Sequence, residues 1–230
     1  MVEQGNHNPL VGGSNPSPAT NFPRSILLAA FLTVVGACAG YDPGPETFLH
    51  QFSQVKPTAQ RFTHCYFSSC RSHQETFVTD QEFARIRAQF DPSPRDGVEE
   101  RERIGKAIAL WEEIVGARTG TWRDKGTDAV AFLSDGYQLD CLDETFNTTS
   151  YLMMMRAAGL IRFHTIRHPS SRGIISYFGV PHHAATIVDN ADAQRYVVDS
   201  WFFDNGVAPV IMKVETWEKG WSPDRPGAGR

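Results

Sequence analysis

The stretch Gln138-Leu-Asp-Cys-Leu-Asp-Glu-Thr-Phe146 decides how this 230-residue chain is interpreted, because it places Cys141 at the start of an expected helix. A histidine pair follows in residues 181–188 (PHHAATIV), and Asp199 follows in residues 196–201 (YVVDSW). A cysteine at a helix N-terminus, then a strand histidine and a strand aspartate, is the order of a thiol nucleophile, its base and the group that orients the base. The pattern therefore predicts nucleophilic catalysis at Cys141.

The base is expected to be one of two adjacent histidines, His182 and His183. Neighbouring residues on a strand point to opposite faces, so only one of the two can face Cys141. A helix N-terminus lowers the pKa of a thiol, and an adjacent imidazole lowers it further. Asp143 and Glu144, in the first turn, act in the opposite direction, because negative charge disfavours the thiolate.

The composition is that of an ordinary globular protein. Hydrophobic residues make up 41% of the chain and charged residues 21%, which is enough for one sizeable core. The formal net charge is -4, so the sequence indicates no basic surface. Nucleic acid is therefore not expected as a partner.

Helical periodicity comes first along the domain, and β-strand patterns follow it. Helices are expected at 79–90, 98–117 and 141–158, and strands at 161–166, 173–178, 184–188, 195–201 and 210–214. Helices followed by consecutive strands predict an α+β domain with an antiparallel sheet. Trp111 is expected in the core, and the charged run 99–102 is expected in solvent. The inner face of the helix at 141–158 is expected to be Leu142, Phe146, Met153 and Ala157.

The chain is expected to divide into three parts. Residues 1–37 are interpreted as a dispensable N-terminus plus a lipoprotein signal peptide, residues 38–58 as a tether, and residues 59–230 as the domain. The apolar run at 26–35 follows Arg24 and is too short to span a bilayer, which suits a signal peptide.

The sequence Val35-Gly-Ala-Cys38 then resembles a bacterial lipobox. The resemblance implies cleavage before Cys38 and lipid on that residue. The membrane would then be a partner through this lipid, at the periplasmic side of the outer membrane in a cell with two membranes. A plain secretory signal or a buried apolar strand is the alternative.

The chain has four cysteines, and the remaining three follow Cys38. Cys65 and Cys70 are close enough in sequence to form a disulfide in an oxidising envelope. The alternative is two reduced core residues. A bridge between them leaves Cys141 unpaired, as a reactive thiol requires.

Several motifs together resemble the transglutaminase-like cysteine peptidases, and in particular the bacterial transglutaminase-like cysteine proteinases. They are Asp140-Cys-Leu-Asp143, the helix that runs to Ala158-Gly159-Leu160, His183-Ala-Ala-Thr-Ile187 and Tyr196-Val-Val-Asp199. The resemblance covers roughly residues 82–203. It implies a papain-like core in which a nucleophile helix, with helices before it, packs on an antiparallel sheet.

Carried over onto this sequence, the resemblance assigns Cys141 as the nucleophile, His183 as the general base and acid, and Asp199 as the orienter. His183 fits the motif, and His182 stays as the alternative. The implied function is a cell-envelope thiol hydrolase or protease that cleaves amide bonds of a protein or peptide through a thioester. No cofactor is expected.

Two departures and three alternatives accompany this interpretation. Leu139 stands where the family often has Gly, and Ala185 stands where an aromatic residue is common. A papain-like peptidoglycan amide hydrolase typically has Asp-Cys-Ser-Gly, which residues 140–143 do not match. A catalytically inactive binding module is the second alternative. The third is a metal site, but the spacing of the candidate histidines matches no zinc signature. These histidines are His164, His168, His182 and His183.

Trp201 and Phe202 follow Asp199 closely in the sequence. They are expected either to wall the site or to fill the core.

Overall fold

The structure, a computed structural model, describes most of the chain beyond its N-terminal segment. The described residues are 43–127, 136–176 and 180–224, without the side chains of 174–176 and 180. The expected signal peptide and Cys38 lie outside them. No helix in these three ranges combines the length and the apolar character needed to cross a membrane.

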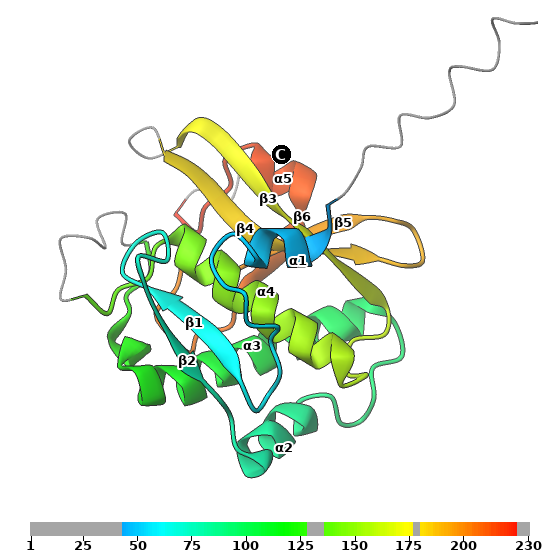
Figure 1. The fold of residues 1–230 in the computed structure, drawn as a ribbon. Coiled ribbons are helices and arrows are strands. Elements are labelled where there is room, and N and C mark those ends of the chain that lie inside the picture. Colours follow the sequence, from blue (N-terminus) through cyan, green and yellow to red (C-terminus); the bar gives the residue numbers. More distant parts are fainter. Residues whose placement is uncertain (1–42, 128–135, 177–179, 225–230) are drawn as a thin grey trace, which may run out of the picture. The chain divides into compact units, whose positions relative to one another are not determined.

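The chain forms a mixed α+β fold with two antiparallel sheets, as predicted (Figure 1). The larger sheet has the strand order β3-β4-β5-β6, and β1 pairs with β2 in a separate hairpin. The elements are α1 (Gly44–Leu49), β1 (Phe62–Tyr66), β2 (Ser72–Thr76), α2 (Asp80–Ala88), α3 (Gly97–Thr119), a 3-10 turn (Thr121–Arg123), α4 (Cys141–Ala157), β3 (His164–Ser176), β4 (Val180–Asp189), β5 (Arg195–Asp199), β6 (Val210–Lys213) and α5 (Val214–Glu218).

The strands differ from expectation in two ways. The expected strands at 161–166 and 173–178 overlap one long strand, β3, whose described residues are His164–Ser176, and residues 177–178 lie outside the described part of the chain. The pairing of β3 with β4 shifts register between Arg167 and Ser170 and again between Arg172 and Ser176. The hairpin β1–β2 was not predicted. Its second strand alternates between exposed and partly buried positions, so it lacks the apolar run that marks a strand in a sequence.

Two helix ends follow from residues that are close together in the sequence. At the start of α2, Thr79 and Glu82 cap each other in a capping box. At the end of α3, Gly120 adopts a φ of 90°, and a Cβ at this position would approach Tyr137 to 2.6 Å. Only glycine meets both conditions at this position.

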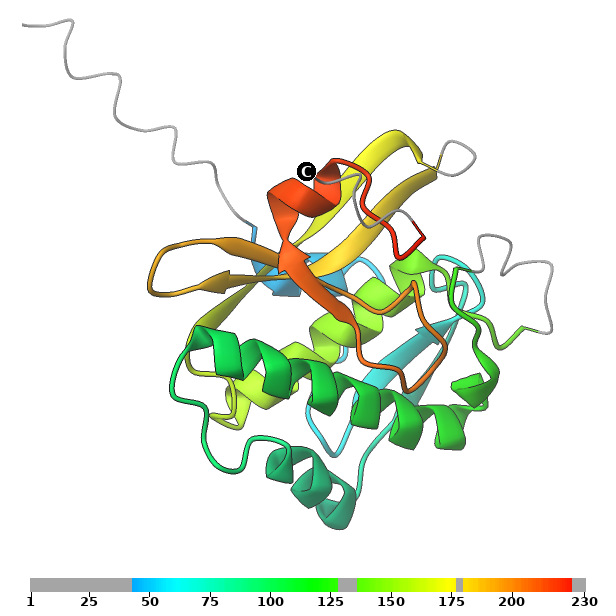
Figure 2. The ribbon, with the colours of Figure 1, turned by 180° about the vertical axis from the view of Figure 1, so that it is seen from behind.

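Helix α4 is buried nearly all round, because α3, β1 and the larger sheet all pack against it (Figures 1 and 2). This burial corrects the expected inner face: Ala157 is exposed, and Leu142 and Met153 are only half-buried. Tyr151 stacks on Trp111 with ring centroids 4.9 Å apart, and both residues are buried in the main core as the apolar pattern predicts for Trp111. A helix that is covered on every side belongs to the core rather than to the surface.

Part of the expected tether belongs to the fold. Residues 44–49 form α1, which packs against β3 and α4. Phe48 and Leu49 are buried in a small cluster with the Cys65–Cys70 pair and Phe146. The sequence gives little sign of this helix, because it is short and its two buried residues are too few to set a period.

Glu100 also departs from the sequence analysis, which placed it in solvent. Its side chain is fully buried, and it accepts hydrogen bonds from the backbone N–H groups of residues 162–164 and from His164 Nδ1. Burial raises the pKa of Glu100, but the donors from His164 and the backbone lower it overall. Beside this pair, Arg101 donates to Asp189 at 3.0 Å. These contacts fasten the start of α3 to the ends of β3 and β4.

We predict that Glu100→Gln lowers the free energy of unfolding by about 3 kcal/mol, because one partner of a buried, hydrogen-bonded pair is neutralised. Urea denaturation measures the change. Glu99→Gln is the matched control, since Glu99 pairs with Arg95 at the protein surface. Equal unfolding midpoints for the two variants would contradict the role assigned to Glu100.

Candidate active site

Cys141 is the first residue of α4, as predicted, and Asp140 caps the helix. Asp140 Oδ1 accepts the N–H groups of Leu142 and Asp143, each at 2.9 Å. In return, Asp143 Oδ2 accepts the N–H of Asp140 at 3.1 Å. This capping box fixes the first turn of the helix, and with it the position of the thiol.

The loop between β1 and β2 is fastened to the same carboxylates. Asp140 Oδ2 accepts the N–H of Ser69 at 2.8 Å, and Asp143 Oδ1 accepts the N–H of Cys70 at 2.6 Å. A disulfide joins Cys65 to Cys70, the pair that the sequence analysis expected, with Cα atoms 4.7 Å apart. Within the loop, residues 67–70 all have positive φ values between 57° and 61°, although none is glycine. Such a run of left-handed residues costs free energy, so the disulfide and the carboxylates must hold it.

The histidine assignment is the main correction. The motif favours His183 as the partner of Asp199, but His182 Nε2 donates to Asp199 Oδ2 at 2.7 Å. His183 points elsewhere, and its Nδ1 lies 2.7 Å from Ser171 Oγ on β3. The physical reason is the alternation of the strand, which gives the two side chains opposite directions. Which of the two meets β5 depends on the sheet register, and a short motif does not encode that register.

The second ring nitrogen of His182 bears on its chemistry. In the neutral imidazole, Nε2 carries the proton that Asp199 accepts and Nδ1 has a free lone pair. Nδ1 is buried and has no hydrogen-bond partner within the described part of the chain. A buried ring nitrogen that has a lone pair and no partner is a candidate for a proton acceptor.

Cys141 is the free thiol in the described ranges, and its side chain lies against the first residues of β4. Its Sγ is 3.8 Å from the carbonyl oxygen of Pro181, and the N–H of His183 also acts on the thiol. No hydrogen bond joins Sγ to either imidazole ring. The thiol is therefore engaged with the backbone on both sides of His182.

Burial raises the pKa of the Cys141 thiol to about 12, against the lowering effect of the His183 N–H. The carboxylates of Asp140, Asp199 and Asp143 raise it further. The dipole of α4 does not offset these effects, and the thiol is protonated at neutral pH. Chemistry at this sulfur therefore requires a base that removes the proton during attack rather than a preformed thiolate.

Aromatic rings enclose His182. The ring centroids of Trp201, Phe202 and Trp217 lie 4.8, 5.4 and 5.3 Å from that of the imidazole. Trp201 and Phe202 are both buried and both contact His182, so their positions fit either of the two roles expected for them. Trp217 comes from α5, which the sequence analysis did not predict, and no motif there signals it.

A pair of buried carboxyl groups lies between α3 and α4. Burial raises the pKa of Glu112 to about 7, against hydrogen bonds from Ser200 and from the N–H of Gly206. Burial also raises the pKa of Glu144, and the negative charges of Glu112 and Asp124 add to this effect. The pair favours holding a proton at neutral pH, because two charges cannot be accommodated there.

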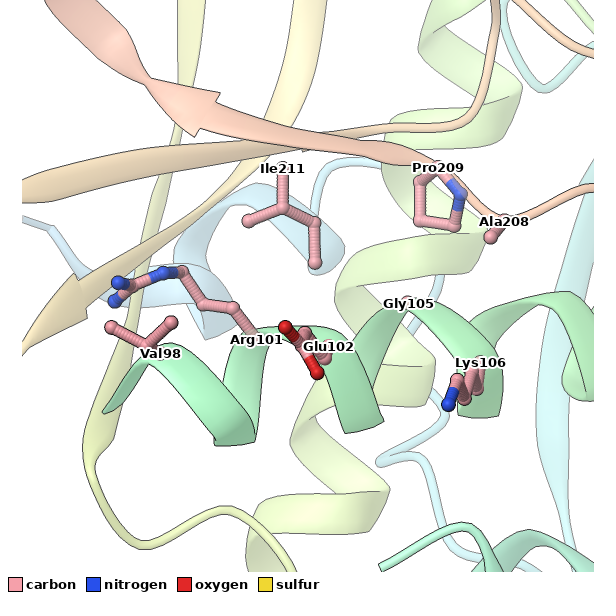
Figure 3. A pocket seen from close by; sticks show the side chains of 8 residues that line it. All are labelled: Val98, Arg101, Glu102, Gly105, Lys106, Ala208, Pro209 and Ile211. Atoms are coloured by element: carbon pink, nitrogen blue, oxygen red, sulfur yellow. The ribbon is translucent and has the colours of Figure 1, made fainter. Parts of the chain in front are cut away.

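The two remaining candidate histidines, His164 and His168, have partners other than Cys141 and Asp199. His164 binds Glu100, and His168 packs against Phe48. Among the described residues, no group of three or more His, Cys, Asp or Glu is placed to hold a metal ion. A groove of about 450 Å³ between α3 and β6 contains none of the predicted site residues (Figure 3). Its lining consists of Val98, Arg101, Glu102, Gly105, Lys106, Ala208, Pro209 and Ile211.

Comparisons with protein-family models, with curated proteins and with solved structures gave no match to this chain.

We predict that replacing both Cys65 and Cys70 by alanine lowers the free energy of unfolding by about 2 kcal/mol, because the short closed loop no longer restrains the unfolded chain. Urea denaturation tests this. A reductant should bring the wild-type midpoint down to that of the double variant and leave the variant unchanged. An unfolding midpoint of the wild type that is the same with and without the reductant would contradict a stabilising disulfide.

The buried pair predicts a pH dependence of stability. The folded chain holds the Glu112 proton up to about pH 7, whereas the ordinary value is 4.5. Between these values the unfolded chain binds fewer protons at this residue, so the contribution of Glu112 to stability falls as pH rises and levels off above pH 7, a loss on the order of 3 kcal/mol.

Glu112→Gln should reduce this decline, as measured by thermal melting across the same pH range. The control is Glu113→Gln, because the neighbouring Glu113 is exposed and should keep the wild-type dependence. Parallel curves for wild type and Glu112→Gln would refute the assignment.

Proposed function

We propose that the chain is a thiol hydrolase with a transglutaminase-like core, and that it cleaves amide bonds of a protein or peptide through a thioester at Cys141. The base in this proposal is His182, in place of His183, and Asp199 orients it. The observation that carries the proposal is the buried His182–Asp199 pair at 2.7 Å, with a free thiol against the carbonyl of the preceding residue, Pro181.

The proposed reaction follows from the atoms available. His182 Nδ1 takes the proton of the Cys141 thiol as Sγ attacks the carbonyl carbon of the substrate. The C–N bond then breaks, and the proton passes from Nδ1 to the leaving amine. Water attacks the resulting thioester, the C–S bond breaks, and the sulfur regains a proton. Before the first step the thiol must turn from Pro181 O towards Nδ1, since it donates to that carbonyl in the structure.

Several features support this chemistry. The capping box and the loop at 67–70 hold the start of α4, so the sulfur has a defined position. The aromatic wall around His182 excludes water from the imidazole–carboxylate pair, which strengthens their interaction. Expected lipid attachment at Cys38 completes the proposal by placing the enzyme at the membrane of the cell envelope, where a disulfide can persist.

One observation favours a second candidate, a catalytically inactive binding module with the same core. The pKa of the Cys141 thiol is raised to about 12, and no bond links the sulfur to an imidazole. In such a module the His182–Asp199 pair would be structural. The two candidates differ in one property, namely whether the reactivity of Cys141 depends on His182.

We predict that His182→Ala slows alkylation of Cys141 by about tenfold or more at neutral pH, because the thiol loses the base that would take its proton. The measurement is the rate of iodoacetamide modification, followed at the Cys141 peptide by mass spectrometry so that Cys38 does not contribute. Hydrolysis of a peptide mixture by the wild type, absent from Cys141→Ser, is the companion assay.

His183→Ala is the matched control in this experiment. It truncates the neighbouring side chain but keeps the backbone N–H that faces the sulfur, so the rate should stay within about twofold of wild type. Equal rates for wild type, His182→Ala and His183→Ala would overturn the enzymatic proposal in favour of the binding module. A loss in His183→Ala alone would restore the original assignment of the base.

A further inference from the structure

Asp199 is held by a second donor. Trp217 Nε1 donates to Asp199 Oδ2 at 2.7 Å, and this is the same oxygen that accepts from His182 Nε2 at 2.7 Å. Trp217 is fully buried and Asp199 nearly so. Two N–H donors therefore fix the direction of one carboxylate oxygen inside the protein.

Trp217 is itself fixed by its surroundings. The guanidinium of Arg172 on β3 lies 4.4 Å from the centroid of the indole ring and also donates to the Trp217 carbonyl. The indole packs in a cluster with Val214 of α5 and with Ala184 and Val197 of the sheet. A ring that is stacked, bonded and buried has a single orientation, so it can serve as a fixed reference for the carboxylate.

We propose that Trp217 is a positioning residue of the site: it holds Asp199 so that Oδ2 keeps the His182 ring in one orientation, with the proton on Nε2 and the lone pair on Nδ1. The inference rests on the proposed function and adds to it a residue from α5. Without the indole N–H, the carboxylate is free to rotate and the imidazole is no longer held in a single tautomer.

The first test is Trp217→Phe in the full-length chain, which removes the N–H but keeps an aromatic ring. Alkylation of Cys141 by iodoacetamide should slow by about tenfold, the usual effect of losing one hydrogen bond to a charged group. Trp111→Phe is the matched control, because Trp111 is also fully buried and its Nε1 has no hydrogen-bond partner among the described residues. This variant should stay within about twofold of wild type.

The second test separates positioning from a general loss of structure. Trp217→Phe is combined with His182→Ala, and the four rates form a double-mutant cycle. If Trp217 acts through His182, the substitution at 217 has no further effect once the imidazole is gone. An equal loss in both backgrounds would overturn the proposal, because it would show that Trp217 only supports the fold.

A third variant guards against misfolding of Trp217→Phe. β-(3-Benzothienyl)alanine at position 217 has the shape of tryptophan, with sulfur in place of the indole N–H, and should reproduce the tenfold loss. Wild-type reactivity in this variant would refute the role of the hydrogen bond. If the rate of Cys141 alkylation depends on His182 but not on Trp217, only the positioning role of Trp217 is refuted. If the rate does not depend on His182, the proposed function is refuted.

Discussion

The burial of α4 on all sides is the constraint on which the rest of the structure depends. Because α3, β1 and the larger sheet cover the helix, few of its residues are even partly exposed, and Cys141 and Leu142 at its start are among them. A helix start near the surface still has free N–H groups that need acceptors. Asp140 and Asp143 supply them, and the same two carboxylates also hold the loop at 67–70. One set of hydrogen bonds thus joins the helix, the hairpin and the thiol.

This solution has an electrostatic cost at the sulfur. The carboxylates that stabilise the helix start also raise the pKa of Cys141, to which burial makes the larger contribution. The usual benefit of a helix N-terminus for a thiolate is therefore outweighed by burial together with the charge of the residues that cap the helix. What remains is a neutral thiol that is engaged with the backbone on both sides of His182, a histidine that already has its carboxylate partner.

Local signals in the sequence were sufficient for local features. The capping box of α2, the left-handed Gly120 and the Cys65–Cys70 pair each depend on residues a few positions apart. The two helices accordingly lie close to their expected bounds, and the disulfide formed as expected. The features that sequence analysis missed depend on distant residues. Glu100 is buried because His164 lies beside it, and the choice of His182 depends on how β4 meets β5.

The hairpin and α5 were missed for a related reason. The turn between β1 and β2 has no glycine at its left-handed positions, so the usual turn chemistry is absent from the sequence. Helix α5 has only five residues, too few for a helical period to be recognised. Its Trp217 meets the site only because the chain returns to Asp199 after β6.

The spacing of the cysteines also bears on how the chain is oxidised as it is made. Cys65 and Cys70 are separated by five positions, whereas Cys141 follows 71 residues after Cys70. In a chain that enters an oxidising compartment from its N-terminus, the two near thiols meet first, since a short loop closes far faster than a long one. In such a chain Cys141 would arrive when Cys65 and Cys70 are already joined, and this order would leave Cys141 reduced.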